Sequence, residues 1–145
     1  MGNICRSPTA EGYFRHHLRA AGLEDAYEVD SAGTHGYHVG HPPDDRACRT
    51  AAGRGIDISM LRARRVEPGD FDRYDLVVAM DEANLAALEQ MGRGRRARVA
   101  LMLDWGDGDV REVPDPYYGG QDGFDTMCDL LEGATLALLE DLRDT

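Results

Sequence analysis

The sequence predicts an α/β fold in which a single layer of open, mostly parallel β-sheet is flanked by helices. Short apolar runs of strand length alternate along the chain with amphipathic segments of helix length, which is the order expected of such a fold. A length of 145 residues is typical of one compact domain, here residues 1–145, and no repeat or linker divides it. Ligands of these folds bind beyond the carboxyl ends of the strands.

Three segments have the composition of strands. Residues 27–31 favour a short strand, residues 76–80 form the apolar run Leu-Val-Val-Ala-Met, and residues 99–103 form another apolar run. Asp81 follows the second run directly and has the chemistry of an N-cap for a helix through residue 91. This order predicts a strand that leads straight into a helix.

Capping residues mark the first helix. Ser7 has the chemistry of an N-cap, and Pro8 favours the first helical position. Gly22 is suited to end the helix because glycine readily adopts a left-handed conformation. We therefore expect a helix over residues 8–21 that begins at a glycine-containing loop.

Two further helices follow from the same signals. Residues 44–52 favour a short helix that two glycines end. A Gly, Pro and Asp-rich loop over residues 104–120 is long enough to favour a functional role. It leads to a final helix with one apolar face, formed by Phe124, Met127, Leu131, Leu138 and Leu142.

Charge and cysteine content exclude several classes of function. The formal net charge is -11, from 27 acidic and 16 basic residues, and such a chain repels nucleic acid and anionic membranes. Three widely spaced cysteines, with no CxxC pair, suit a reducing compartment better than a disulfide scaffold. The chain shows no signal peptide and no apolar run long enough for a membrane span. We expect a cytoplasmic protein.

The beginning of the chain has the properties of a phosphate cradle. Successive backbone N–H groups run into a helix N-terminus, and an arginine stands at the rim. Such a loop would hold an oxyanion through its amides, the helix dipole and a guanidinium group. The residues concerned are Gly2, Asn3, Ile4, Cys5, Arg6 and Ser7.

This loop resembles the signature of the low-molecular-weight protein tyrosine phosphatases, whose full form is Cys-x-Gly-Asn-x-Cys-Arg-Ser. Met1 corresponds to the x after the nucleophilic cysteine, so the family pattern places that cysteine immediately before Met1. The similarity continues in the family's order through residues 30–34, 43–46, 55–57, 63–66, 70–72, 80–85 and 115–119.

The resemblance implies a phosphotyrosine protein phosphatase I-like fold, a flavodoxin-like three-layer arrangement. The family has four strands, and this chain is expected to have three, because the first strand is absent from it. That strand would lie between the strands near Val29 and Val77. We expect the chain as given to be truncated and poorly stable, since loss of the first strand leaves backbone groups of its two neighbours unpaired.

The resemblance also implies the chemistry. In the family a cysteine thiolate attacks the phosphotyrosine phosphorus to form a cysteinyl-phosphate, without metal or organic cofactor. Arg6 corresponds to the arginine that binds the phosphoryl oxygens, and Asp115 to the general acid. The expected substrate is a phosphotyrosine-containing protein or an aryl phosphate, and the expected state is a monomer or weak dimer.

Other site residues are implied in the same way. Tyr37, Tyr117 and Tyr118 correspond to the aromatic walls around a phosphotyrosine ring. Asn3, Ser7 and Ser31 resemble the hydrogen-bonding set that supports the loop, while Leu61 stands where the family often has a histidine. Cys5 resembles a neighbouring thiol that can trap an oxidised nucleophile.

Competing interpretations remain. Without the nucleophile, the chain itself would be a non-catalytic module that binds phosphate or phosphotyrosine. A protein arginine phosphatase resembles the signature with threonine in place of Ile4, and an arsenate reductase relative would need further cysteines. Cys48 and Arg54 fit a bare Cys-x5-Arg spacing, but Cys48 lies in a helical pattern. His35, His38 and His41 lack further zinc ligands, so we expect loop histidines.

Overall fold

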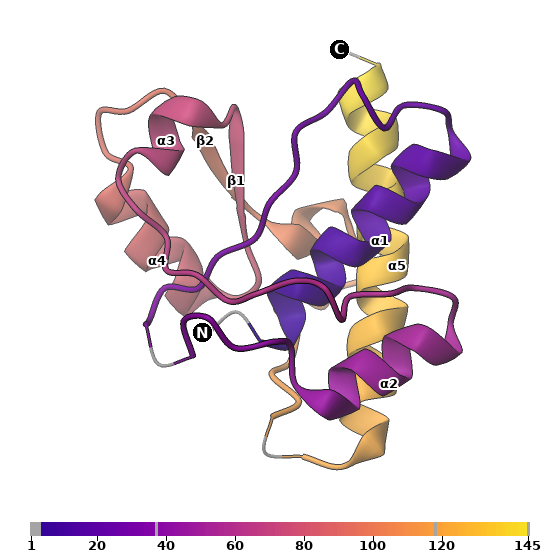
Figure 1. Cartoon of the computed structure of the whole chain (residues 1–145). Coiled ribbons are helices and arrows are strands. Elements are labelled where there is room, and N and C mark those ends of the chain that lie inside the picture. Colours follow the sequence, from indigo (N-terminus) through magenta and orange to yellow (C-terminus); the bar gives the residue numbers. More distant parts are fainter. Residues whose placement is uncertain (1–3, 37, 118, 145) are drawn as a thin grey trace.

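The computed structural model describes residues 4–36, 38–117 and 119–144. From β1 onward its strands and helices alternate as the sequence predicts, and Figure 1 follows the elements along the chain. The elements are α1 (Arg6–Ala20), α2 (Asp45–Gly53), α3 (Asp70–Arg73), β1 (Leu76–Ala79), α4 (Glu82–Met91), β2 (Arg98–Leu101), the 3-10 helix η1 (Met102–Trp105) and α5 (Gln121–Arg143).

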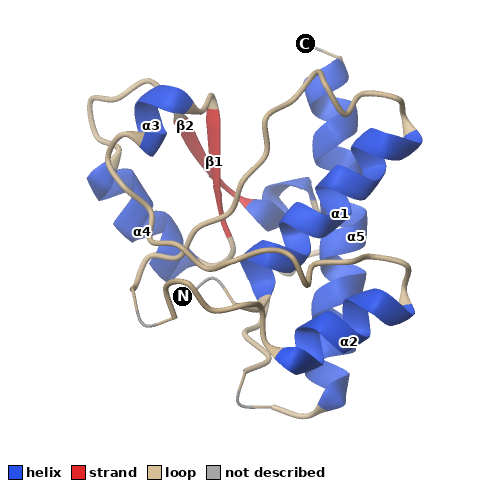
Figure 2. Ribbon diagram, in the orientation of Figure 1, coloured by secondary structure: helices blue, strands red, loops and turns tan. Residues whose placement is uncertain are grey.

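The sheet of the described residues consists of β1 and β2, which pair in parallel with Leu76 opposite Arg98. Side chains alternate between the two faces of β1, as the pleat requires. Val78 packs against the larger hydrophobic core, while Val77 packs against a second cluster that includes Leu88 of α4. Helices therefore cover both faces, and the layers follow the order helix, sheet, helix (Figure 2).

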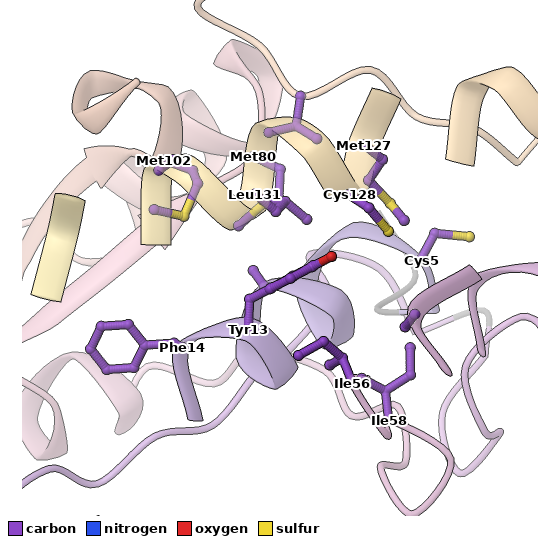
Figure 3. Close-up of a cluster of buried hydrophobic side chains, with 14 of the residues drawn as sticks. Cys5, Tyr13, Phe14, Ile56, Ile58, Met80, Met102, Met127, Cys128 and Leu131 are labelled. Atoms are coloured by element: carbon purple, nitrogen blue, oxygen red, sulfur yellow. The ribbon is translucent and has the colours of Figure 1, made fainter. Parts of the chain in front are cut away.

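The larger core lies between α1, α5 and α2. Tyr13 of α1, Phe124 and Leu131 of α5, and Ile56 after α2 are all almost completely buried. Figure 3 shows part of this cluster, with α1 and α5 on opposite sides of the packed side chains. This packing fixes α1 and therefore fixes the loop that precedes it.

The first helix begins earlier than the sequence indicates. The Cys5 carbonyl already accepts hydrogen bonds from the Thr9 backbone N–H, at 3.3 Å, and from the Thr9 hydroxyl, at 2.7 Å. Ser7 is therefore inside the first turn and is not the N-cap, so that prediction is wrong. The other end agrees with the prediction, because Gly22 follows the helix with a φ of 71°.

The strand predicted at residues 27–31 is also wrong. The segment has no regular secondary structure, and it pairs with no strand among the described residues. A single parallel bridge, between Gly33 and Arg65, lies just beyond it. Strand formation needs a neighbour for the backbone groups, and β1 does not reach this segment. The third predicted strand is shorter than expected, because η1 replaces its last two residues.

The close approach of α1 to the segment after α2 depends on a glycine. A Cβ atom added to Gly12 would lie 2.5 Å from Cγ2 of Ile58 and 2.8 Å from Cγ2 of Ile56. We expect Gly12→Ala to lower the free energy of unfolding by about 1–3 kcal/mol, because the crowded core must shift. Urea denaturation followed by circular dichroism measures the change.

Gly133→Ala is the matched control. Gly133 is also inside a helix, but nothing lies within 4 Å of an added Cβ. Alanine should raise stability there by up to about 1 kcal/mol, since it favours the helix. Equal effects of the two substitutions would contradict the packing of α1 on Ile58.

Candidate functional site

Arg6 is the centre of the candidate site. It is the first residue of α1, and its side chain is 5% exposed. One guanidinium nitrogen, Nη1, donates to Oδ2 of Asp81 and to the carbonyl oxygen of Val113, each at 2.8 Å. Asp81 follows β1, and the Val113 N–H donates to the Met80 carbonyl. The guanidinium is thus held at the carboxyl end of β1, where the fold predicts a ligand.

Asp81 serves two elements at once. It is the N-cap of α4, accepting the Asn84 backbone N–H at 2.7 Å, and it accepts the hydrogen bond from Arg6. Burial acts to raise the pKa of Asp81, but the bonds from Asn84 and Arg6 outweigh it, so the pKa is lowered. The carboxylate therefore stays ionised and keeps the Arg6 guanidinium in place.

The start of α1 places backbone N–H donors next to Arg6. Arg6 and Ser7 are the first two residues of the first turn, so their amides have no intrahelical carbonyl to bind. Pro8 has no N–H, and the side chain of the N-cap Cys5 makes no capping hydrogen bond. The helix is 15 residues long, so its dipole adds positive potential at this end. The arrangement suits an oxyanion.

Asp115 lies across the site from α1. Its Oδ2 is 4.0 Å from Nη2 of Arg6, and its Oδ1 accepts the Tyr117 backbone N–H at 3.1 Å. The Asp115 side chain is 38% exposed, so its carboxylate is open to solvent. The structure thus brings together Arg6 and Asp115, the two residues that we predicted to be catalytic. They are 109 positions apart in the sequence.

Arg46 holds the loop that carries Asp115, a role that the sequence analysis did not assign. Its Nη2 donates to the Tyr117 carbonyl at 2.7 Å and its Nη1 to the Gly119 carbonyl at 3.3 Å. Its guanidinium lies 4.8 Å from the ring centre of Phe124. The sequence contains the motif Pro-Asp-x-Arg at residues 43–46, but the motif does not identify the groups that Arg46 binds.

Asp44 connects Arg46 to the cradle. Its carboxylate caps α2 and accepts hydrogen bonds from the Arg46 backbone and guanidinium. Its own backbone N–H donates to the Ile4 carbonyl at 2.8 Å. The N-terminus of α2 therefore ties the loop before α1 to the loop around Asp115.

Tyr117 is the described member of the predicted aromatic wall. It is half-buried and lines the cavity that also contains Arg6 and Asp115. Its ring centre is 6.1 Å from that of His38 and 5.7 Å from the Arg46 guanidinium. The predictions for Tyr37 and Tyr118 lie outside the described residues.

The residues predicted to support the phosphate-binding loop lie at different places around α1. Ser7 is half-buried in the first turn of α1 and lines the same cavity. The Ser31 hydroxyl donates to Oε1 of Glu11 at 2.7 Å, so it binds the side of α1. Sequence reasoning missed Glu11, a buried carboxylate that also accepts from Arg15. The predictions for Gly2 and Asn3 fall outside the described residues.

None of the three cysteines is an activated thiol. Burial raises the pKa of Cys5 to about 12, and the carboxylates of Asp44 and Asp115 act in the same direction. Burial also raises the pKa of Cys48 and of Cys128. Cys5 and Cys128 lie among the buried side chains drawn in Figure 3. A thiol of raised pKa is a poor nucleophile near neutral pH.

Cys48 and Arg54 do not form a second site. Cys48 lies within α2, with its Sγ 3.7 Å from the Pro43 carbonyl. Arg54 points to α5 instead, where it pairs with Asp129 at 2.6 Å and Asp125 at 3.6 Å. No group of three or more metal-ligating side chains occurs in the part of the chain that the structure describes.

Known proteins resemble this chain in sequence and in fold. Residues 1–145 match the family described as low molecular weight phosphotyrosine protein phosphatase. A low molecular weight protein-tyrosine-phosphatase of Streptomyces coelicolor is 42% identical, over 99% of this chain and 90% of that protein.

Solved structures agree with this assignment. A product-state mimic of the protein tyrosine phosphatase from Entamoeba histolytica is 34% identical, with a TM-score of 0.94 over 100% of this chain and 92% of that chain. A Drosophila arginine phosphatase is 28% identical, with a TM-score of 0.92 over 99% of this chain and 94% of that chain. The chain belongs to the low molecular weight phosphotyrosine protein phosphatase family.

Proposed function

We propose that this site binds the phosphate group of a phosphotyrosine side chain in a protein and supports its hydrolysis. The observation that carries the proposal is the buried Arg6 guanidinium, fixed at the carboxyl end of β1 with Asp115 at 4.0 Å. Arg6 and the amides at the start of α1 bind the phosphoryl oxygens. Asp115 donates a proton to the leaving phenolate, and the Tyr117 ring packs beside the substrate ring.

The hydrolysis of a phosphate ester in this family also needs an attacking thiolate. In the family pattern the nucleophile precedes the residue that corresponds to Met1, and none of the three cysteines of this chain has a lowered pKa. We therefore propose that the 145-residue chain binds phosphotyrosine without turnover. Hydrolysis through a cysteinyl-phosphate requires the nucleophilic cysteine, which the family pattern places before the residue that corresponds to Met1.

We also propose a cytoplasmic location for the protein. All three cysteines are unpaired in the structure, which supports a reducing, cytoplasmic location. Of the helices that the structure describes, none is long and apolar enough to span a membrane.

Binding should depend on the planar guanidinium of Arg6. We expect Arg6→Lys to weaken binding of a phosphotyrosine peptide by about 10- to 100-fold, because lysine keeps the charge but loses the fork of charge-assisted hydrogen bonds. Isothermal titration calorimetry measures the dissociation constant. Arg93→Lys, at an exposed position, is the matched control and should bind as the unchanged chain does.

Turnover should depend on an added cysteine. The 145-residue chain should not hydrolyse p-nitrophenyl phosphate, whereas a chain extended before Met1 by an aliphatic strand ending in cysteine should do so. In the extended chain, Asp115→Asn should lower kcat by about 10²- to 10⁴-fold for phenyl phosphate. The loss should be smaller for p-nitrophenyl phosphate, whose leaving group needs less protonation. Ordinary turnover by the 145-residue chain would contradict the missing nucleophile.

The native thiols should react slowly. With iodoacetamide at pH 8, Cys5 and Cys128 should be protected, because both are buried and their thiols are protonated at that pH. Cys48 is half-buried and should react faster than either. Mass spectrometry of peptides after timed alkylation gives the rates, and alkylation in urea should remove the difference. Fast native labelling of Cys5 would show that its thiol is activated.

A further inference from the structure

The Arg46 guanidinium lies over two aromatic rings at once. Its central carbon, Cζ, is 4.8 Å from the ring centre of Phe124 and 5.7 Å from that of Tyr117. Phe124 is completely buried in α5, whereas Tyr117 is half-buried and lines the cavity that also contains Arg6 and Asp115. A planar guanidinium packs well on aromatic faces, because its charge is attracted to the π-electrons of the ring. Arg46 therefore connects a ring of the core to a ring of the cavity wall.

Hydrogen bonds join the same guanidinium to the backbone beside the Tyr117 ring. Nη2 donates to the Tyr117 carbonyl at 2.7 Å, and Nη1 donates to the Gly119 carbonyl at 3.3 Å. On another side, Nε and Nη2 donate to the two carboxylate oxygens of Asp44, each at 3.2 Å. A guanidinium bound by several acceptors in its own plane cannot rotate without breaking these bonds. The backbone and the ring of Tyr117 are thus both held by one rigid group.

The backbone of Arg46 is fixed by the packing of α2. Arg46 is the second residue of this helix, and Ala47 and Ala51 of the same helix are completely buried. The Arg46 carbonyl accepts the Thr50 hydroxyl at 2.8 Å, and that hydroxyl accepts the Gln121 side-chain amide at 2.9 Å. Figure 1 shows α2 beside the first turns of α5, where this last bond forms. The guanidinium therefore extends from a well-anchored position.

Arg46 acts on a bound ligand through Tyr117. It is not one of the described residues that line the cavity, so it lies behind the wall. The guanidinium that faces the phosphate position is that of Arg6, which is held by Asp81. Two effects of Arg46 are therefore separable: its positive charge acts at a distance on any anion, whereas its planar shape acts only on the position of the wall.

We propose that Arg46 is a positioning residue that makes the site prefer the phosphate ester of a phenol, because it fixes the Tyr117 ring against which the substrate ring packs. The inference rests on the proposed function, since it concerns the ring of a bound phosphotyrosine. A wall that is fixed before binding loses little conformational freedom when the ligand arrives, so the contact gives more affinity. An aromatic pair of this kind contributes roughly 2- to 10-fold in affinity.

The test compares a phosphotyrosine peptide with inorganic phosphate, both titrated into the ¹⁵N-labelled 145-residue chain and followed by NMR. Arg46→Lys keeps the charge and removes the planar group. It should weaken binding of the peptide by about 3- to 10-fold and leave the dissociation constant of phosphate within about twofold. Unchanged phosphate binding also shows that the variant is folded. Arg49→Lys, the same change at an exposed position of α2, should alter neither constant.

A double-substitution cycle tests whether Arg46 acts through the Tyr117 ring. Tyr117→Leu removes the ring and should weaken peptide binding by about 3- to 10-fold. In the Tyr117→Leu chain, a further Arg46→Lys should change peptide binding by less than about twofold, because the ring that Arg46 positions is gone. Without any ligand, Arg46→Lys should also shift the ring resonances of Tyr117.

Three results would overturn the inference. These are equal weakening of both ligands by Arg46→Lys, unchanged binding of the phosphotyrosine peptide by that variant, and additive losses in the double variant. Failure of the proposed function has a different signature, because the unchanged chain would then bind neither ligand, and the inference would fall with it.

Discussion

The ion pair between Arg6 and Asp81 is the interaction on which the rest of the site depends. It joins the first residue of α1 to the cap of α4, and the Val113 carbonyl joins the same guanidinium to the loop before α5. The pair is largely buried, so removal of either partner would leave an uncompensated charge and cost roughly 3–5 kcal/mol. Asp81 therefore fixes the orientation of the guanidinium that we propose to bind phosphate, and it ties the start of α1 to α4.

A second arginine provides the same kind of connection on the opposite side. Arg46 binds carbonyl groups of the loop after Asp115, and its partner Asp44 binds the Ile4 carbonyl. The two predicted catalytic groups thus lie on segments that α2 holds from one side and α4 from the other. Catalysis by positioned groups requires this kind of support, because a small displacement of the acid relative to the phosphate lowers the rate strongly. The surrounding helices provide a rigid frame for both.

The cavity at the start of α1 holds no activated thiol from the three cysteines. Ile4, Arg6 and Asp115 line this cavity together with residues of β1. The cysteine that does lie in the cradle, Cys5, is buried and beside two carboxylates, which favours the protonated thiol. The site therefore brings together the groups that we propose as oxyanion donors and acid, while its neighbouring cysteine is a protonated thiol.

The sequence by itself determined the alternation of strands and helices from residue 76 onward, the Asp81 cap and the family. These depend on contiguous residues: a cap lies next to its helix, and the signature around Arg6 is one unbroken run. Only the tertiary structure decided the partners of Arg6, which are 75 and 107 positions away, and the role of Arg46. It also decided that residues 27–31 form no strand, because a strand exists only where a neighbour pairs with its backbone. Local patterns specify the conformation of contiguous residues. Strand pairing and ion pairs depend instead on which distant residues the fold places next to one another.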